Sequence, residues 1–125
     1  MKSRILYVED NFQNKRLVRK ILTARGYEIL EADDGESGVE LATKEKPDLI
    51  LMDISIPGID GIEATRLIKA NDDTNEIPVV ALTANAMRGD RERFLAAGCD
   101  DYLPKPINTM DLLRVIKEHL DGKGK

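Results

Sequence analysis

Four short apolar segments of the chain each end in polar residues whose chemistry suits phosphoryl transfer. These residues are Glu9 with Asp10, Asp53, Thr83 and Lys105. If the segments are parallel strands, all of these side chains lie at one edge of the sheet, where open α/β sheets place their ligand sites. An acidic cluster, a hydroxyl and one amine at that edge predict metal-assisted phosphoryl chemistry.

The charges at this edge predict a bound divalent cation. Glu9, Asp10 and Asp53 bring three negative charges, and two like charges about 4 Å apart repel by roughly 4 kcal/mol at an effective dielectric of about 20. Lys105 supplies one positive charge, so a divalent cation would bring the local sum to zero. Because carboxylate oxygens are the ligands that Mg²⁺ prefers, we expect Mg²⁺ as the cofactor.

Asp53 is the strongest candidate for a reactive carboxylate. It ends an almost wholly apolar segment of the kind buried in parallel sheets, and a loop with Pro57 and Gly58 follows it rather than a helix start. A buried charge is costly unless it is paired or bound to a metal. Beside a metal and Lys105, Asp53 could attack phosphorus and form an aspartyl phosphate, and Thr83 could donate a hydrogen bond to a phosphoryl oxygen.

Structural roles stay open for several residues. Asp10 could instead cap the helix that follows it, and Thr83 could serve packing or capping at a strand end. Phe12 could protrude beside the site, where a donor protein would dock, or pack on the first helix. His119 is expected on the surface near the end of the last helix, and Cys99 is expected to be a small, partly buried residue beside a turn.

The apolar segments alternate with amphipathic stretches, which predicts a doubly wound (βα)5 domain of the α/β class with a five-stranded parallel sheet. Right-handed crossovers and helices on both faces require the strand order 2-1-3-4-5, with the switch point between strands one and three. Gly26 and Gly98 should end the first and fourth helices, and Asn108 or Thr109 should cap the fifth. The expected strands span residues 4 to 8, 27 to 32, 48 to 53, 78 to 82 and 100 to 103, and the expected helices span residues 13 to 25, 35 to 45, 60 to 70, 86 to 97 and 109 to 120.

Length and composition limit the number of domains and the kinds of partner. A chain of 125 residues with 42% hydrophobic and 34% charged residues fits one domain, which we expect to span residues 1 to 121, with a flexible tail at 122 to 125 and no output domain. The net charge of -4 argues against nucleic-acid binding. No membrane span or secretory signal is visible, and a single cysteine fits a cytoplasmic protein.

The motifs of the chain resemble those of the receiver domain of two-component response regulators, which has the CheY-like, flavodoxin-type fold. The resemblance implies that Asp53 accepts a phosphoryl group from a phosphohistidine on a sensor histidine kinase or a histidine phosphotransfer protein. It also implies that the protein is no separate enzyme and catalyses only its own phosphorylation and dephosphorylation. The matching segments, which follow the order and spacing of the family, are Val8–Asn11, Leu51–Ile54, Pro57–Gly61, Ala81–Ala84 and Tyr102–Pro106.

The resemblance assigns a metal role to four residues. Glu9 and Asp10 correspond to the acidic pair that binds the metal together with Asp53, and the backbone carbonyl of Ser55 would complete the protein ligands. Because Ser55 and Asn85 flank the phosphoryl path, substitutions there should change the lifetime of the aspartyl phosphate more than they change the fold.

The resemblance also implies a switch. Thr83 and Lys105 would bind the phosphoryl oxygens, and the Lys105–Pro106 peptide bond would be cis. On phosphorylation Thr83 would move toward the phosphoryl group and Tyr102 would turn inward behind it, although Tyr102 could also be a plain half-buried aromatic residue of a strand. The fourth helix, the fifth strand and the fifth helix, with Arg88 among their residues, would then contact a downstream protein.

Three functions stay open. The chain could be a stand-alone regulator similar to the DivK group, because residues 9–14, 83–87 and 98–102 look closer to that group and to hybrid-kinase receivers than to motor-binding regulators. It could instead be a receiver excised from a hybrid histidine kinase. It could also be a Mg²⁺-dependent phosphatase of the haloacid dehalogenase type, although those enzymes carry a second aspartate two residues after the nucleophile, where this chain has Ser55.

Overall fold

The computed structural model describes residues 2–56, 58–84 and 90–123 of the chain. Its strands are all parallel and follow the order β2-β1-β3-β4-β5, so the predicted fold class and strand order are confirmed. The strands are β1 (Arg4–Val8), β2 (Glu28–Ala32), β3 (Leu49–Asp53), β4 (Val79–Thr83) and β5 (Asp101–Pro104), and the helices are α1 (Phe12–Ala24), α2 (Gly35–Glu45), α3 (Gly61–Ala70), α4 (Asp90–Ala97) and α5 (Thr109–Lys123).

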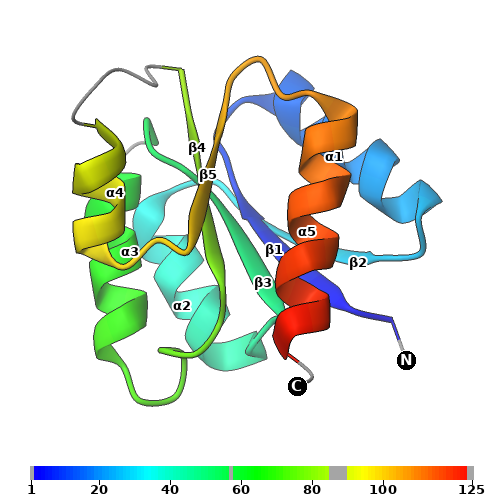
Figure 1. Cartoon of the computed structure of the whole chain (residues 1–125). Coiled ribbons are helices and arrows are strands. Elements are labelled where there is room, and N and C mark those ends of the chain that lie inside the picture. The colour runs from blue at the N-terminus through cyan, green and yellow to red at the C-terminus, as the bar shows by residue number, and fades with distance from the viewer. Residues whose placement is uncertain (1, 57, 85–89, 124–125) are drawn as a thin grey trace.

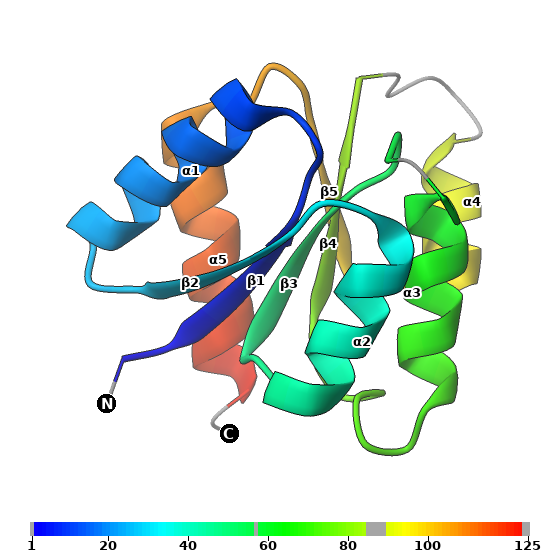
Figure 2. The same cartoon turned by 180° about the vertical axis from the view of Figure 1, so that it is seen from behind.

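The helices cover the sheet in two layers. Helices α1 and α5 lie on one face, and α2, α3 and α4 lie on the other (Figures 1 and 2). Both ends of the chain lie at the edge where the strands begin (Figure 1). The opposite edge, where the strands end, therefore carries the loops that follow β1, β3, β4 and β5, and it is the edge at which sequence analysis expects the site.

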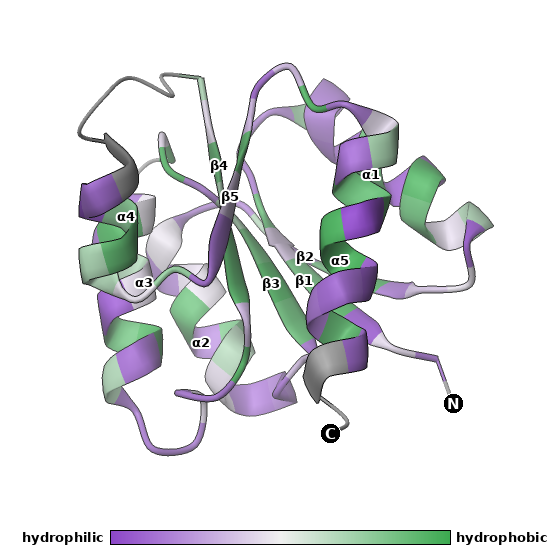
Figure 3. Cartoon of the chain, in the orientation of Figure 1, coloured by the Kyte–Doolittle hydropathy of each residue, from purple (hydrophilic) through white to green (hydrophobic). Residues whose placement is uncertain are grey.

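Two apolar layers hold the helices to the sheet. Alternate residues of a strand point to opposite faces, so Leu6 and Val8 pack under α2 and α3, whereas Ile5 and Tyr7 pack under α1 and α5. All residues of β3 and β4 are buried, as expected for central strands of a parallel sheet. In Figure 3 these strands are hydrophobic along most of their length, whereas the helices alternate between hydrophobic and hydrophilic residues. Burial of the apolar residues drives folding and fixes the register of the strands, and thereby the position at which each strand ends.

Helix α1 begins one residue earlier than predicted, and its N-cap is not Asp10, the residue that sequence analysis offers for this role. Asn11 is the N-cap, because its Oδ1 accepts a hydrogen bond from the backbone N–H of Asn14 at 2.9 Å. The hypothesis that Asp10 caps this helix is therefore wrong, and Asp10 is left available to the site. Gly26 follows the helix in the left-handed region with φ 87°, as predicted, and Tyr27 closes the turn by donating to the carbonyl of Leu22.

The last two helices differ from prediction at their ends. Asn108 rather than Thr109 caps α5, because Asn108 Oδ1 accepts a hydrogen bond from Asp111 N at 3.0 Å. The helix then extends to Lys123, so the first two residues of the predicted tail are helical, and residues 124 and 125 lie outside the described residues. Helix α4 is described from Asp90 and ends before Gly98, as predicted. Its expected first residues, 86 to 89, with Arg88, lie outside the described residues, as does Asn85, which is expected beside the phosphoryl path.

Candidate functional site

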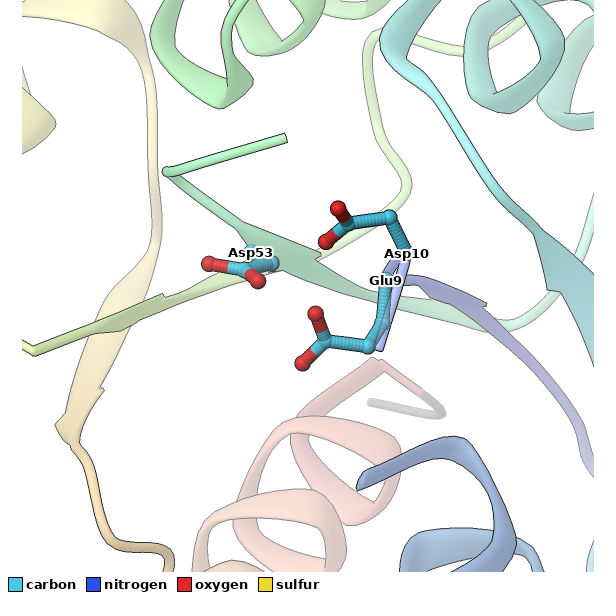
Figure 4. Close-up of side chains that lie close together, drawn as sticks. All are labelled: Glu9, Asp10 and Asp53. Carbon is cyan, nitrogen blue, oxygen red and sulfur yellow. The ribbon is translucent and has the colours of Figure 1, made fainter. Parts of the chain in front are cut away.

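Three carboxylates converge where β1 and β3 end. Asp53 is the last residue of β3, and Glu9 and Asp10 directly follow β1, which pairs with β3 at the predicted switch point. One ligand atom from each of the three lies within 4.8 Å of the others, and Figure 4 shows the three side chains turned toward one another. Glu9 and Asp53 are only 1% and 2% exposed, whereas Asp10 is exposed. The grouping that sequence analysis expects is therefore present.

Lys105 brings a positive charge into this cluster from the residue after β5. Its Nζ lies 2.8 Å from Asp53 Oδ2 and 3.2 Å from Glu9 Oε1. The backbone of Lys105 is held by a 2.8 Å hydrogen bond from its N–H to the carbonyl of Thr83, and the Lys105–Pro106 peptide bond is cis, the isomer that the resemblance implies. The side chain thus extends across the strand ends to ion-pair with two buried carboxylates.

The protonation of the two buried carboxyls is unequal. Burial raises the pKa of Asp53 to about 6, and the neighbouring Glu9 adds to the rise, while Lys105 and the N–H of Ser55 oppose it. Burial also tends to raise the pKa of Glu9, but its hydrogen bond with Asp53 and the charge of Lys105 lower that pKa to about 2. Without a metal, the proton that this pair takes up on acidification therefore goes to Asp53, and Glu9 stays ionised.

Glu9 is held by neighbours that sequence analysis missed. Its Oε1 accepts hydrogen bonds from the hydroxyl of Tyr7 at 3.0 Å and from Asn14 Nδ2 at 3.2 Å. Tyr7 interrupts the aliphatic segment Ile5–Val8, and a tyrosine in a buried strand needs a hydrogen-bond partner for its hydroxyl. Residues two positions apart along a strand lie on the same face, so the sequence could have indicated Glu9 as the partner of the Tyr7 hydroxyl.

The loop after Asp53 is closely fitted to the site. Ser55 lies in this loop, and its backbone N–H donates to Asp53 Oδ1 at 3.1 Å. Glu36 at the start of α2 accepts a 3.0 Å hydrogen bond from the N–H of Ile59. A Cβ on Gly61 would lie 2.4 Å from the carbonyl oxygen of Asp53, so the start of α3 approaches the strand end as only glycine allows.

The two predicted switch residues lie on neighbouring strands. Thr83 is the last residue of β4, is 5% exposed, and stands at the same edge as Asp53. Tyr102 of β5 is partly buried, and its ring centroid lies 6.3 Å from that of Phe94 in α4. Thr83 is thus at the site, and Tyr102 is one strand further out against α4.

Other candidate residues lie away from the cluster or beside it. His119 is partly buried and its Nε2 lies 3.1 Å from Asp101 Oδ2, so the expectation of a plain surface residue is only partly met. Cys99 is buried, with its Sγ 3.8 Å from Thr65 Oγ1. Phe12 is 67% exposed, which agrees with the hypothesis that it protrudes beside the site and not with the hypothesis that it packs on the first helix.

Replacing Asp53 with asparagine is expected to stabilise the metal-free protein by about 1–3 kcal/mol at pH 7.5. The physical reason is the raised pKa of Asp53, from 3.8 to about 6, which means that folding disfavours its charged form. The folded protein holds a proton between about pH 4 and 6 that the unfolded chain has lost, so wild-type stability falls as the pH rises through that window. Urea unfolding in EDTA at pH 7.5 and 4.5 measures both effects.

The advantage of Asp53→Asn should therefore be smaller at pH 4.5, where Asp53 is already protonated. A variant that is less stable than the wild type at pH 7.5 would contradict this expectation. It would mean that the charge of Lys105 fully offsets the cost of burying the ionised Asp53 carboxylate.

The family model of the response regulator receiver domain matches residues 5–117 of the chain. The chain belongs to the response regulator receiver family. Among similar receivers is the polar-differentiation response regulator DivK of Brucella anthropi, 42% identical over 120 residues that cover 96% of this chain and 98% of DivK. The DivK of Brucella ovis is 41% identical with the same coverage.

Solved receiver structures agree with this fold. The receiver domain of the sensor histidine kinase PA1611 from Pseudomonas aeruginosa is 40% identical, covers 97% of this chain and 99% of its own, has a TM-score of 0.90, and holds a magnesium ion in its active-site cleft. The chemotaxis protein CheY4 of Vibrio cholerae is 26% identical with a TM-score of 0.90, covering 96% and 100%. The chain is thus a receiver of two-component signalling, and the family differs from that of the phosphatase alternative. In the described ranges, no helix combines the length and apolar character that crossing a bilayer requires.

Proposed function

We propose that Asp53 is the phosphoacceptor of this receiver and that a phosphohistidine on a sensor histidine kinase or a histidine phosphotransfer protein supplies the phosphoryl group. An oxygen of the Asp53 carboxylate attacks phosphorus, the bond between phosphorus and the histidine nitrogen breaks, and that nitrogen keeps the electron pair and takes a proton from solvent. The observation that carries the proposal is the position of Lys105 Nζ, 2.8 Å from a buried carboxylate that ends the central strand.

Mg²⁺ fits the residues of this cluster. Three carboxylates and one ammonium group leave two negative charges, which a divalent cation balances. The donor set is made of hard carboxylate oxygens, which Mg²⁺ prefers. The ligands would be Glu9, Asp10, Asp53 and the backbone carbonyl of Ser55. A bound Mg²⁺ would stabilise negative charge on the oxygens of the transferring group.

The protein side chains supply orientation and charge. Lys105 and Thr83 hold the phosphoryl oxygens, while the Ser55 N–H and Lys105 orient the Asp53 carboxylate for attack. The receiver thereby catalyses its own phosphorylation, and attack of water on the same phosphorus breaks its bond to the Asp53 oxygen, which restores the carboxylate and releases inorganic phosphate.

The phosphodonor docks beside α1 in this proposal. An open pocket of about 390 Å³ lies against the site, and Lys105 belongs to both. Phe12 and Leu17 are exposed on α1. This helix contains no acidic residue and four basic ones. These features suit a helical donor domain with apolar and acidic side chains around its phosphohistidine. The pocket is lined by Asn14, Leu17, Val18, Ala84, Lys105, Pro106 and Ile107.

The output passes through α4, β5 and α5 to a downstream protein. Phosphorylation adds negative charge at Asp53, Thr83 moves toward the phosphoryl group, and Tyr102 turns inward behind Thr83. Two contacts support coupling of the three elements, because Tyr102 of β5 packs on Phe94 of α4 and Asp101 of β5 contacts His119 of α5. Neither nucleic acid nor a membrane is a partner in this proposal, and a cytoplasmic location is part of it.

Asp10→Asn is expected to weaken Mg²⁺ binding about 10- to 100-fold, because the variant loses one charged oxygen ligand. Titration calorimetry on the metal-free protein measures this directly. Asp72→Asn is the matched control, since Asp72 is an exposed aspartate of the loop between α3 and β4 at the other end of the sheet. An unchanged affinity in Asp10→Asn would remove Asp10 from the metal site.

The proposed function is tested by incubating the protein with acetyl phosphate and measuring its intact mass. The wild type should gain one phosphoryl group with Mg²⁺ and none in EDTA. A wild type that gains no phosphoryl group under either condition, or gains it equally in both, would contradict the proposal.

A further inference from the structure

The hydroxyl of Tyr7 is buried inside the apolar layer beneath α1 and α5. Tyr7 is fully buried and packs in the same cluster as Val18, Leu22 and Leu112. A buried hydroxyl is costly unless it is hydrogen-bonded, and this one donates to Glu9 Oε1 at 3.0 Å. The strand therefore carries a donor whose partner is a residue of the proposed metal site.

Three donors meet on the same oxygen of Glu9. Oε1 accepts from Tyr7 at 3.0 Å, from Asn14 Nδ2 at 3.2 Å and from Lys105 Nζ at 3.2 Å. Apart from a proton shared with the Asp53 carboxyl, Oε2 accepts among the described residues only from the backbone N–H of Asn11, at a longer 3.3 Å. A carboxylate offers about two lone-pair sites on each oxygen, so Oε1 is fully engaged and Oε2 keeps capacity for another partner.

We propose that Tyr7 and Asn14 are positioning residues that commit one oxygen of Glu9 to the protein and leave the other for the metal, so that the site favours Mg²⁺ over Ca²⁺. The inference rests on the proposed metal site. Ca²⁺ takes six to eight oxygens and often uses both oxygens of one carboxylate, whereas Mg²⁺ keeps an octahedral shell with several waters. A glutamate that is limited to one free oxygen therefore serves Mg²⁺ better than Ca²⁺.

The test is calorimetric titration of the metal-free protein with Mg²⁺ alone and with Ca²⁺ alone at pH 7.5. Tyr7→Phe keeps the ring in the core and removes only the hydroxyl. We expect the ratio of Mg²⁺ affinity to Ca²⁺ affinity to fall about threefold or more in this variant, mainly through a gain of Ca²⁺ affinity, because the shortest of the three hydrogen bonds to Oε1 is lost. Asn14→Ala, which changes a side chain nearer the surface, should lower the ratio in the same direction and provides a second variant if Tyr7→Phe does not fold.

Tyr27→Phe is the matched control. Tyr27 also packs against this layer, but it precedes β2 at the opposite end of the sheet, so its variant should keep the wild-type ratio. A wild type that binds neither ion would overturn the proposed metal site itself. A wild type that binds Mg²⁺ but does not prefer it over Ca²⁺, or whose ratio survives in both Tyr7→Phe and Asn14→Ala, would overturn this inference alone.

A spectroscopic signature gives a second measurement. The chain has no tryptophan and three tyrosines, so its near-ultraviolet absorption reports the tyrosines. Addition of Mg²⁺ should produce a tyrosine difference spectrum in the wild type and in Tyr27→Phe, and a clearly smaller one in Tyr7→Phe. An equal signal in all three proteins would mean that Glu9 does not transmit metal binding to Tyr7.

Discussion

Lys105→Met is expected to slow phosphorylation by acetyl phosphate about 100- to 1,000-fold, the loss typical of removing one donor that stabilises transition-state charge. Lys105 Nζ is 2.8 Å from Asp53 and 3.2 Å from Glu9, so an ammonium group lies beside the oxygen that attacks phosphorus. Methionine keeps the length of the side chain and its apolar packing. Initial rates from intact mass, measured at saturating Mg²⁺, give the effect.

The slower rate in Lys105→Met should not come from loss of the metal. Removing the ammonium leaves three uncompensated carboxylates, so Mg²⁺ should bind the variant at least as tightly as the wild type. Lys117→Met, which replaces an exposed lysine on α5, is the matched control and should react at the wild-type rate. A Lys105→Met rate within about threefold of the wild type, well short of the loss expected for a transition-state donor, would show that Lys105 does not hold the transferring group.

Mg²⁺ binding is expected to weaken about tenfold between pH 7 and pH 5. Without metal the pKa of Asp53 is raised to about 6, so protons compete with Mg²⁺ for this carboxylate below that pH. The competition lowers the apparent affinity about 11-fold at pH 5 but only about 1.1-fold at pH 7, the factors that follow from one protonating group. Glu9, with its pKa lowered to about 2, stays ionised throughout and contributes no change in this window.

Titration calorimetry across this pH range measures the affinities, and Asp53→Asn is the control. The variant binds Mg²⁺ more weakly, but it lacks the titrating carboxyl, so its affinity should change little between pH 7 and pH 5. If the wild-type affinity is also flat, the metal does not displace a proton from Asp53, and Asp53 is not a ligand in the way proposed.

The sequence was sufficient to predict the sheet edge and the residues that meet there. Asp53 ends β3, Glu9 and Lys105 directly follow β1 and β5, and parallel strands bring their carboxyl ends to one edge of the sheet. Burial also fixes which residues of a strand face each layer, because a shift of one position would expose the apolar side chains. The predicted strand bounds consequently differ from the observed ones by no more than one residue at either end.

The sequence was not sufficient where two residues compete for one local role. Asp10 and Asn11 are both good N-caps, and only the backbone path decides that Asn11 caps α1 and that Asp10 joins the site. The predicted tail begins at Gly122, yet a glycine costs only about 1 kcal/mol within a helix, and α5 continues to Lys123.

The interactions of Glu9 with Tyr7 and Asn14 needed the structure. Tyr7 reaches Glu9 along β1, whereas Asn14 reaches it from the first turn of α1. The sequence can suggest that a buried tyrosine seeks an acceptor, but it does not place a helix side chain on a particular oxygen. The choice between the two oxygens of Glu9 is therefore visible only in the three-dimensional arrangement.

The most direct test of the central claim is to locate the phosphoryl group. The wild type is phosphorylated with acetyl phosphate and Mg²⁺, the acyl phosphate is reduced with borohydride to convert the modified aspartate to homoserine, and peptide mass spectrometry identifies the residue. We expect homoserine at position 53 and none in Asp53→Asn. Conversion at Asp10, reduction of Glu9, or an acyl phosphate that persists in Asp53→Asn would contradict it.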